Sequence, residues 1–306
     1  MNTTPTTEDR IWAILAHLSA LSFGMGVLLP IIGWSDQRRK SNYASFQSLQ
    51  ALGYQSLGFT IWVLSYLLII MLTSIVLLVS LGSRGSLESV SPTLLIIVFI
   101  LLLGFFAVYL LLPMVAALAC ALGKDFRYPI MGNRLARYLG YEPSRDSEDG
   151  LYEDHELRWV VAMGHFSILI LLWGMLAPLT AWMLQGRHSL FLKFQSIQTL
   201  VYQAVTTIIY FVGGFLYLLG FIFLLAAMGG IGEPNLNSSM GIVGIVIFGI
   251  SLLISFVLIL FVPLLHILGQ WAGYRVLKGD NYLYPLIGRV VERWISKNST
   301  IEEKSA

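Results

Sequence analysis

Long apolar stretches without charge constrain this chain more than any other feature of its sequence. No Asp, Glu, Lys or Arg occurs in four stretches of 25 to 33 residues, which are 57–81, 93–121, 204–229 and 241–273. Each is longer than the roughly 18 apolar residues that indicate a bilayer-spanning helix. Charged residues make up 12% of the chain, against roughly 25% in soluble domains. The sequence therefore predicts an all-α, polytopic integral membrane protein.

Charge and cysteine content exclude several other classes. The net charge is +2, which is too small to favour nucleic acid as a partner. Cys120 is the only cysteine, and a single thiol forms neither an internal disulfide nor a cysteine-ligated zinc site. We therefore expect no metal and no cofactor.

The chain repeats itself at a fixed distance. Eight residues recur 148 positions later: Arg10, His17, Ser19, Leu21, Gly26, Leu28, Pro30 and Trp34. Tyr128-Pro129 recurs as Tyr284-Pro285, 156 positions later. Such self-similarity indicates a tandem duplication. The predicted organisation is a polar tail (1–9), membrane unit 1 (10–141), a solvated, mobile acidic linker (142–156), membrane unit 2 (157–297) and a C-terminal tail (298–306).

Each unit contains three apolar helical segments, six in total. Their predicted bounds are 11–34, 44–81 and 93–121 in unit 1, and 159–182, 192–229 and 241–273 in unit 2. Turn-forming residues separate the second and third segments of each unit. A Tyr-Pro breaker and a basic amphipathic end close each unit.

Charge distribution leaves two topologies open. If all six segments cross, ten of the 19 basic residues lie on one side and nine on the other, which gives the positive-inside rule no direction. If the first segment of each unit is broken and re-enters, only Arg84 lies outside and 18 basic residues face the cytoplasm. Gly24 and Gly26 interrupt the first segment, and Pro30 and Pro178 remove backbone donors within these segments, which favours this second topology. A continuous helix of 24 residues, about 36 Å long, favours the first.

Amide and imidazole side chains recur at matching positions and are the candidate site. Gln47, Gln50 and Tyr54 share a helix face at i, i+3, i+7 spacing. The candidates for a polar membrane contact or a polar lining are His17, Gln47, Gln50, Tyr54 and Gln55, with His165, Gln195, Gln198, Tyr202 and Gln203. One interpretation is structural hydrogen bonding between helices, at ~0.6 kcal/mol each. The other is a solute path, because intramembrane polar groups often face a cavity.

Backbone breakers and basic residues are expected to have structural roles. Pro30, Pro178, Pro129 and Pro285 are the predicted breakers. Basic residues at the end of each unit suit anionic lipid headgroups. No nucleotide-binding loop, zinc motif or nucleophile–base motif occurs, so we expect no catalytic residues and no enzyme.

The combined pattern resembles a bacterial family of small membrane proteins of unknown function. That family is similar to the chloroplast inner-envelope translocon component of the Tic-twenty type. The residues that carry the resemblance are His17, Pro30, Trp34, Gln50-Ala51, Tyr128 and Pro129, then His165, Pro178, Trp182, Gln198, Tyr284 and Pro285. Thr199 replaces the alanine in the second copy. The resemblance implies a helical bundle linked to protein translocation or assembly.

Two functions follow as hypotheses. The first is a non-enzymatic scaffold or translocation-type component of a bacterial inner membrane, with both termini in the cytoplasm. Its two units would pack about a pseudo-two-fold axis where the glutamines and histidines meet, and its partners would be lipid, other membrane proteins or itself. The second is a channel or small-solute transporter lined by those same residues.

Overall fold

The computed structural model describes residues 4–84, 92–143, 150–227 and 239–305, and all of its regular elements there are helical. This confirms the prediction of an all-helical chain for these residues. In order, the elements are α1 (Thr7–Leu18), η1 (Ser19–Val27), α2 (Leu28–Gln37), α3 (Asn42–Arg84), α4 (Pro92–Ala121), α5 (Gly132–Leu139), α6 (Glu153–Phe166), η3 (Ser167–Met175), α7 (Leu176–Gln185), α8 (Leu190–Ala227), α9 (Ser239–Leu277) and α10 (Ile287–Ser305).

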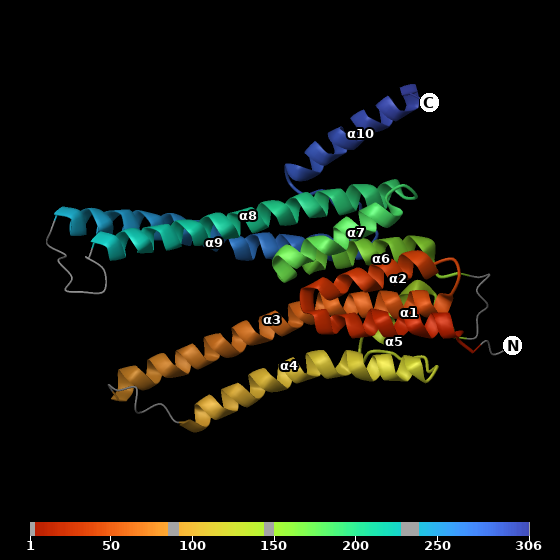
Figure 1. Ribbon diagram of the computed structural model, residues 1–306, viewed down its shortest axis with the longest axis horizontal. Helices are drawn as coiled ribbons and strands as arrows, with labels where there is room; N and C mark the ends of the chain where they lie inside the picture. Colours follow the sequence, from red (N-terminus) through yellow and green to blue (C-terminus); the bar gives the residue numbers. More distant parts are fainter. Residues whose placement is uncertain (1–3, 85–91, 144–149, 228–238, 306) are drawn as a thin grey trace.

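Two long helix pairs extend from a body of shorter helices (Figure 1). We call these pairs, α3 with α4 and α8 with α9, the arms. Helix α3 alone has 43 residues and is about 64 Å long at 1.5 Å per residue. Its first part is buried in the body, whereas side chains farther along, such as Leu64 and Leu68, are about half exposed. Long uncharged helices with exposed apolar side chains suit a lipid environment.

The first segment of unit 1 is a helical hairpin. Gln37, at its end, donates from Nε2 to Oε1 of Glu8, at its start, over 3.1 Å. A methyl group on Gly33 of α2 would lie 3.2 Å from the Trp12 ring of α1. By length and composition, Thr7–Gln37 is one of five segments in the described chain that could cross a membrane. However, the two ends of this segment contact each other, so Gln37 lies at the same end of the molecule as Glu8.

The first segment of unit 2 folds back in the same way. A methyl group on Gly164 of α6 would lie 3.6 Å from Cβ of Pro178 in α7. Both first segments thus have the re-entrant geometry, which was one of the two alternatives left by the sequence. The single-crossing alternative assumed one continuous helix, and each segment is instead interrupted by a 3-10 stretch.

Glycine permits the turn of each hairpin. A methyl group on Gly26 would lie 2.2 Å from the Ser19 carbonyl oxygen, and one on Gly174 would lie 2.1 Å from that of Ser167. No side chain fits at such distances. The turn of the first hairpin therefore falls in the stretch that contains Gly24 and Gly26, and Pro30 and Pro178 lie just after the two turns. Each is the third residue of a returning helix, where its missing N–H has no intrahelical role.

The Tyr-Pro turns close each unit through an unusual backbone conformation. Ile130, which follows Pro129, has φ 66°, and Leu286, which follows Pro285, has φ 65°. This left-handed region is costly for branched side chains. Both turns therefore stop the chain before the helix that follows, as expected for breakers.

Two predicted boundaries are wrong. Glu156 is not part of a solvated linker, because it lies in α6 and only 3% of it is exposed. Residues 144–149 of that linker lie outside the described residues. The C-terminal tail 298–306 is not separate either, since α10 continues to Ser305.

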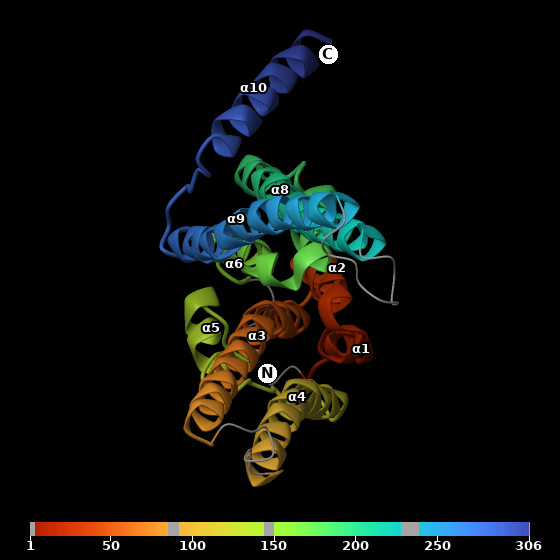
Figure 2. The same cartoon turned by 90° about the vertical axis from the view of Figure 1, so that its left-hand side faces the viewer.

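The two units do not pack as a pseudo-two-fold pair. Helix α6 of unit 2 packs against α3 and α5 of unit 1, but the described residues form no comparable contact of α1 with α8 or α10. Figure 2 shows α6 and α3 in the interior and α1 and α8 toward the outside. The contact between units is therefore symmetric only in part, because α2 packs against its equivalent α7 whereas the α3–α6 contact has no counterpart among the described residues.

The hairpins predict which loops share a membrane side. In a Cys120→Ser background, cysteines that replace the exposed residues Lys40 and His188 should react with an impermeant maleimide from the same side. The reason is that each position follows a hairpin that returns to its starting end. Labelling in right-side-out and inverted vesicles measures this. Labelling of the two positions from opposite sides would contradict the fold.

Candidate functional site

A buried histidine connects three separate segments of unit 1. Nδ1 of His17, in α1, lies 3.0 Å from the hydroxyl oxygen of Tyr128, in the Tyr-Pro turn. Nε2 of the same ring lies 3.0 Å from Oε1 of Gln47, in α3. His17 and Gln47 are fully buried. One imidazole thus joins the hairpin, the long helix and the turn.

The glutamines of α3 bind the backbone of the segment that follows α4. Nε2 of Gln47 donates to Oδ1 of Asp125 over 3.1 Å and to the carbonyl of Phe126 over 3.0 Å. Nε2 of Gln50 donates to the same carbonyl over 3.0 Å. Oε1 of Gln50 accepts the backbone N–H of Tyr128 at 2.9 Å. The two amides therefore replace the water that these backbone groups would otherwise need.

The hydrogen bonds assign the proton on the imidazole. Burial raises the pKa of Tyr128 well above its usual range, so the phenol keeps its proton and donates to Nδ1 of His17. Nε2 then carries the ring proton and donates to Oε1 of Gln47, which also accepts from Gln50 at 3.1 Å. The tautomer is inferred from its partners. A neutral imidazole satisfied in this way has no free nitrogen for a ligand.

Unit 2 contains the same network. Nδ1 of His165 lies 2.9 Å from the Tyr284 hydroxyl, and Nε2 lies 3.3 Å from Oε1 of Gln195. Gln198 donates to the Tyr282 carbonyl over 2.7 Å. Asn281 replaces the carboxylate of unit 1 and accepts from Gln195 at 2.6 Å. The duplicated positions therefore make equivalent contacts.

Thr199, where the second copy departs from the first, lies against this histidine. Its hydroxyl oxygen lies 2.9 Å from Nδ1 of His165 and donates to the Gln195 carbonyl over 2.6 Å. Compared with the alanine of unit 1, Thr199 therefore adds a hydroxyl group, and the Gln195 carbonyl is the acceptor for its proton.

The remaining candidates support the same structure. Tyr54 stacks on Tyr128 with ring centroids 4.2 Å apart, and Tyr202 stacks on Tyr284 at 3.9 Å. Nε2 of Gln55 donates to the Ser19 hydroxyl over 2.9 Å at the start of the hairpin turn.

Gln203 makes the equivalent contact at the second hairpin. Its Nε2 donates to the Gly164 carbonyl over 2.8 Å and to the Ser167 hydroxyl over 3.3 Å. All ten candidates therefore lie in the two networks or at the hairpins. None of their hydrogen bonds described above crosses between units, so the expectation that they meet at an inter-unit axis is wrong.

Different residues join the units, and sequence reasoning missed them. Nε1 of Trp34 donates to Oε1 of Glu156 over 3.1 Å. Arg38 lies 3.6 Å from the other oxygen of Glu156 and donates to Oε1 of Gln185 over 3.2 Å. The signal was present, because Glu156 and Gln185 are the repeats of Glu8 and Gln37 at the offset of 148. In unit 1 that pair binds internally, whereas in unit 2 it binds the other unit.

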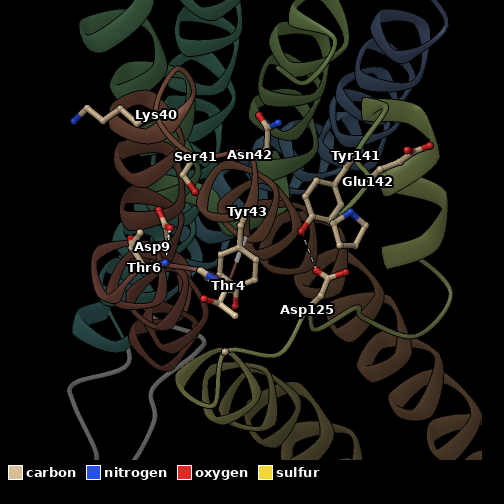
Figure 3. Close-up of a pocket in the computed structure, with 13 residues that line it drawn as sticks. Thr4, Thr6, Asp9, Lys40, Ser41, Asn42, Tyr43, Asp125, Tyr141 and Glu142 are labelled. Carbon is tan, nitrogen blue, oxygen red and sulfur yellow. Dashed lines mark hydrogen bonds between the residues drawn. The ribbon is translucent and has the colours of Figure 1, made fainter. Parts of the chain in front are cut away.

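A surface cavity of about 320 Å³ lies beside the first network (Figure 3). Tyr43 and Tyr141 line it together with Asp125, which accepts from the Tyr141 hydroxyl at 3.2 Å. Within the described ranges, no group of three His, Cys, Asp or Glu residues could hold a metal ion. This cavity therefore exposes the edge of the network to solvent, and its residues give no argument for a metal centre.

Comparison with known proteins connects unit 1 to a membrane protein family. The model of a family described as magnetosome magnetite crystal formation proteins matches residues 8–135. The chain is similar to this family over those residues. They are less than half of the chain and correspond closely to the predicted unit 1. The search of curated proteins and the search of solved structures each found no match.

Removal of the imidazole should destabilise the fold. His17→Leu leaves the Tyr128 hydroxyl without a partner, at a cost of about 1–3 kcal/mol, and leaves Oε1 of Gln47 with Gln50 as its remaining donor. Unfolding in mixed micelles with increasing SDS measures this change. The matched control is His188→Leu at an exposed loop position, with an expected change within about 0.5 kcal/mol. Equal effects of the two variants would show that the network adds no stability.

Burial of Glu156 predicts a dependence of stability on pH. Burial raises the pKa of Glu156 to about 7, and the Arg38 guanidinium and the Trp34 N–H oppose this only in part. Because the folded protein holds this proton more tightly than the unfolded chain does, the contribution of Glu156 to stability is fully present below about pH 4.5 and is lost as pH rises through about 7. This contribution is measured against a variant in which residue 156 cannot ionise.

Glu156→Gln isolates this contribution. The variant keeps an acceptor for the Trp34 N–H but cannot ionise, so the Tm of wild type should fall relative to that of the variant as pH rises from 4.5 to 7. Scanning fluorimetry of both proteins in one detergent measures the difference. Parallel pH profiles would contradict the assignment.

Proposed function

We propose that the protein is a non-enzymatic membrane scaffold whose body organises other components at one face of a membrane. The observation that carries this proposal is the closure of both histidine networks. His17, Gln47, His165 and Gln195 are fully buried, and the polar atoms of these side chains bind one another and nearby backbone. Residues arranged in this way stabilise a platform and offer no free group to a solute or a substrate.

The family similarity supports a particular kind of membrane. The description of the family that matches residues 8–135 refers to magnetite crystal formation. We therefore infer that this scaffold acts in a membrane that surrounds a growing mineral. A role in protein translocation, which the sequence resemblance implies, would be one specific form of this scaffold function.

Charge supports an orientation for the scaffold. With both hairpins returning to the body, Arg84 at the tip of α3 is the one basic residue among the described residues at the far end of the arms, and the other 17 described basic residues lie on the side of the body. The positive-inside rule then assigns the body and both termini to the cytoplasm of a bacterial inner membrane. The basic residues of α10, such as Arg289 and Arg293, suit anionic headgroups.

A solute carrier is the second candidate, and one cavity favours it. A space of about 970 Å³ lies between α3 and α9. Apolar side chains make up most of its lining, and the polar ones include Tyr210, His266 and Gln270. Tyr210 and His266 bind each other at 2.6 Å. A transport path would therefore use these residues rather than the glutamines and histidines expected from the repeat.

Reconstituted vesicles separate the two functions. Proteoliposomes of wild type should pass potassium, protons and ferrous iron at the rate of protein-free vesicles, because both networks are closed. Gln50→Leu with Gln198→Leu should lower stability and leave this rate unchanged. When magnetite is precipitated inside the vesicles, crystals should be more uniform in size with wild type than without protein.

The opposite results identify the alternative. Flux above the protein-free rate that disappears in the double glutamine variant would overturn the scaffold. Flux that instead disappears in His266→Leu would establish the cavity between α3 and α9 as the path. Met183→Leu, at an exposed position in α7, is the matched control and should change neither flux nor crystal size.

A further inference from the structure

The contact that joins the two units depends on one large and one absent side chain. Trp159 of α6 lies directly over Gly53 of α3, where a methyl group would come within 2.4 Å of its ring. Its Nε1 donates to the Leu49 carbonyl over 2.9 Å. Because α1 and α8 do not repeat this contact within the chain, each unit has one half of it without a partner.

The first unpartnered half is on α1. Trp159, Met163 and Phe166 of α6 are buried, each with at most 8% exposed. Their equivalents at the offset of 148 are Ile11, Leu15 and Leu18, which are 50%, 40% and 37% exposed. These residues follow i, i+4, i+7 spacing and form a stripe on one face of the helix. We call this face the α1 stripe.

The second unpartnered half is on α8. Gly53 and Thr60 of α3 are buried and Leu57 is half-buried. Their equivalents, Val201, Val205 and Ile208, are 38%, 41% and 60% exposed. They follow the same i, i+4, i+7 spacing. We call this face the α8 stripe.

The two stripes are complementary in size. Where the buried contact has a tryptophan over a glycine, the exposed faces have Ile11 and Val201. One side chain is smaller than its equivalent and the other is larger, so the combined volume changes little. Volume-conserving exchanges of this kind are tolerated in packed contacts. The isoleucine side chain has no N–H, so it does not need a backbone carbonyl like that of Leu49, which accepts from Trp159.

We propose that copies of this chain associate head to tail, with the α1 stripe of one copy packed on the α8 stripe of the next. The contact repeats between chains the α3–α6 contact that joins the units within one chain. A contact between two different faces is heterologous, and such contacts form rings or open filaments. Figure 2 shows α1 at the right of the bundle and α8 near its top, separated from each other, so one copy can use both faces together.

Site-directed crosslinking tests this contact. Ile11→Cys and Val201→Cys are made separately in a Cys120→Ser background, because Cys120 is the only native cysteine. Both new positions are exposed, so the fold should be kept, and the Tm of each variant checks this. When the two are reconstituted together and treated with a short bismaleimide, a crosslinked dimer should form. The double variant should form dimers, trimers and longer species.

The controls identify the occupants that compete with a second copy. Ile11→Cys mixed with Leu118→Cys, which is exposed on α4, away from the contact between the units, should give no crosslink. Crosslinking of either single variant with itself would mean a two-fold contact and would overturn the proposal. No crosslink in the mixed sample would mean that the stripes face lipid, which also overturns it.

A second variant measures assembly without crosslinking. Leu15→Lys in the α1 stripe should reduce the oligomers seen by mass photometry in nanodiscs or mild detergent to single chains. Leu118→Lys on α4, the matched control at an exposed position outside the contact, should leave the mass distribution of wild type unchanged. Because mass and crosslinking are measured separately from solute flux, this proposal can fail while the scaffold function stands, and the reverse also holds.

Discussion

A buried imidazole with no water to solvate it must have two partners, and the architecture follows from how His17 and His165 obtain theirs. An unpaired buried polar group costs roughly 2–7 kcal/mol depending on its surroundings. Each histidine avoids this cost with a tyrosine from the Tyr-Pro turn and a glutamine from the long helix. Those bonds hold the hairpin, the long helix and the turn together. The body forms at one end of the arms because these three segments meet there.

The two histidine networks are alike, but their surroundings differ. Glu8 binds Gln37 within unit 1, while its repeat, Glu156, is buried against Trp34 and Arg38 of the other unit. Helix α6 lies in the interior, while its repeat α1 lies toward the outside. The two helices have different neighbours because only a contact about a two-fold axis would give both units the same surroundings. The exposed stripes on α1 and α8 arise from the same asymmetry.

Helix positions were accessible from the sequence because apolar length and turn residues are local signals. The predicted segment 93–121 and the observed α4, Pro92–Ala121, agree to one residue. The candidate site was accessible for a similar reason, since repeated polar residues in apolar segments need buried partners. Glu156 was misjudged as part of a solvated linker. Its partners Trp34 and Arg38 are more than 115 positions away in the chain, so no local pattern indicates its burial.

The sequence by itself determined that this chain is helical, apolar enough for a membrane, and built from two similar units with matching polar positions. These properties depend on composition and on spacing along one segment. Tertiary structure alone decided that the first segments fold back and that the units meet through different faces. Those outcomes depend on contacts between distant side chains, such as Trp159 over Gly53. Residue spacing does not indicate which large side chain packs into which gap, because that depends on the three-dimensional arrangement of the helices.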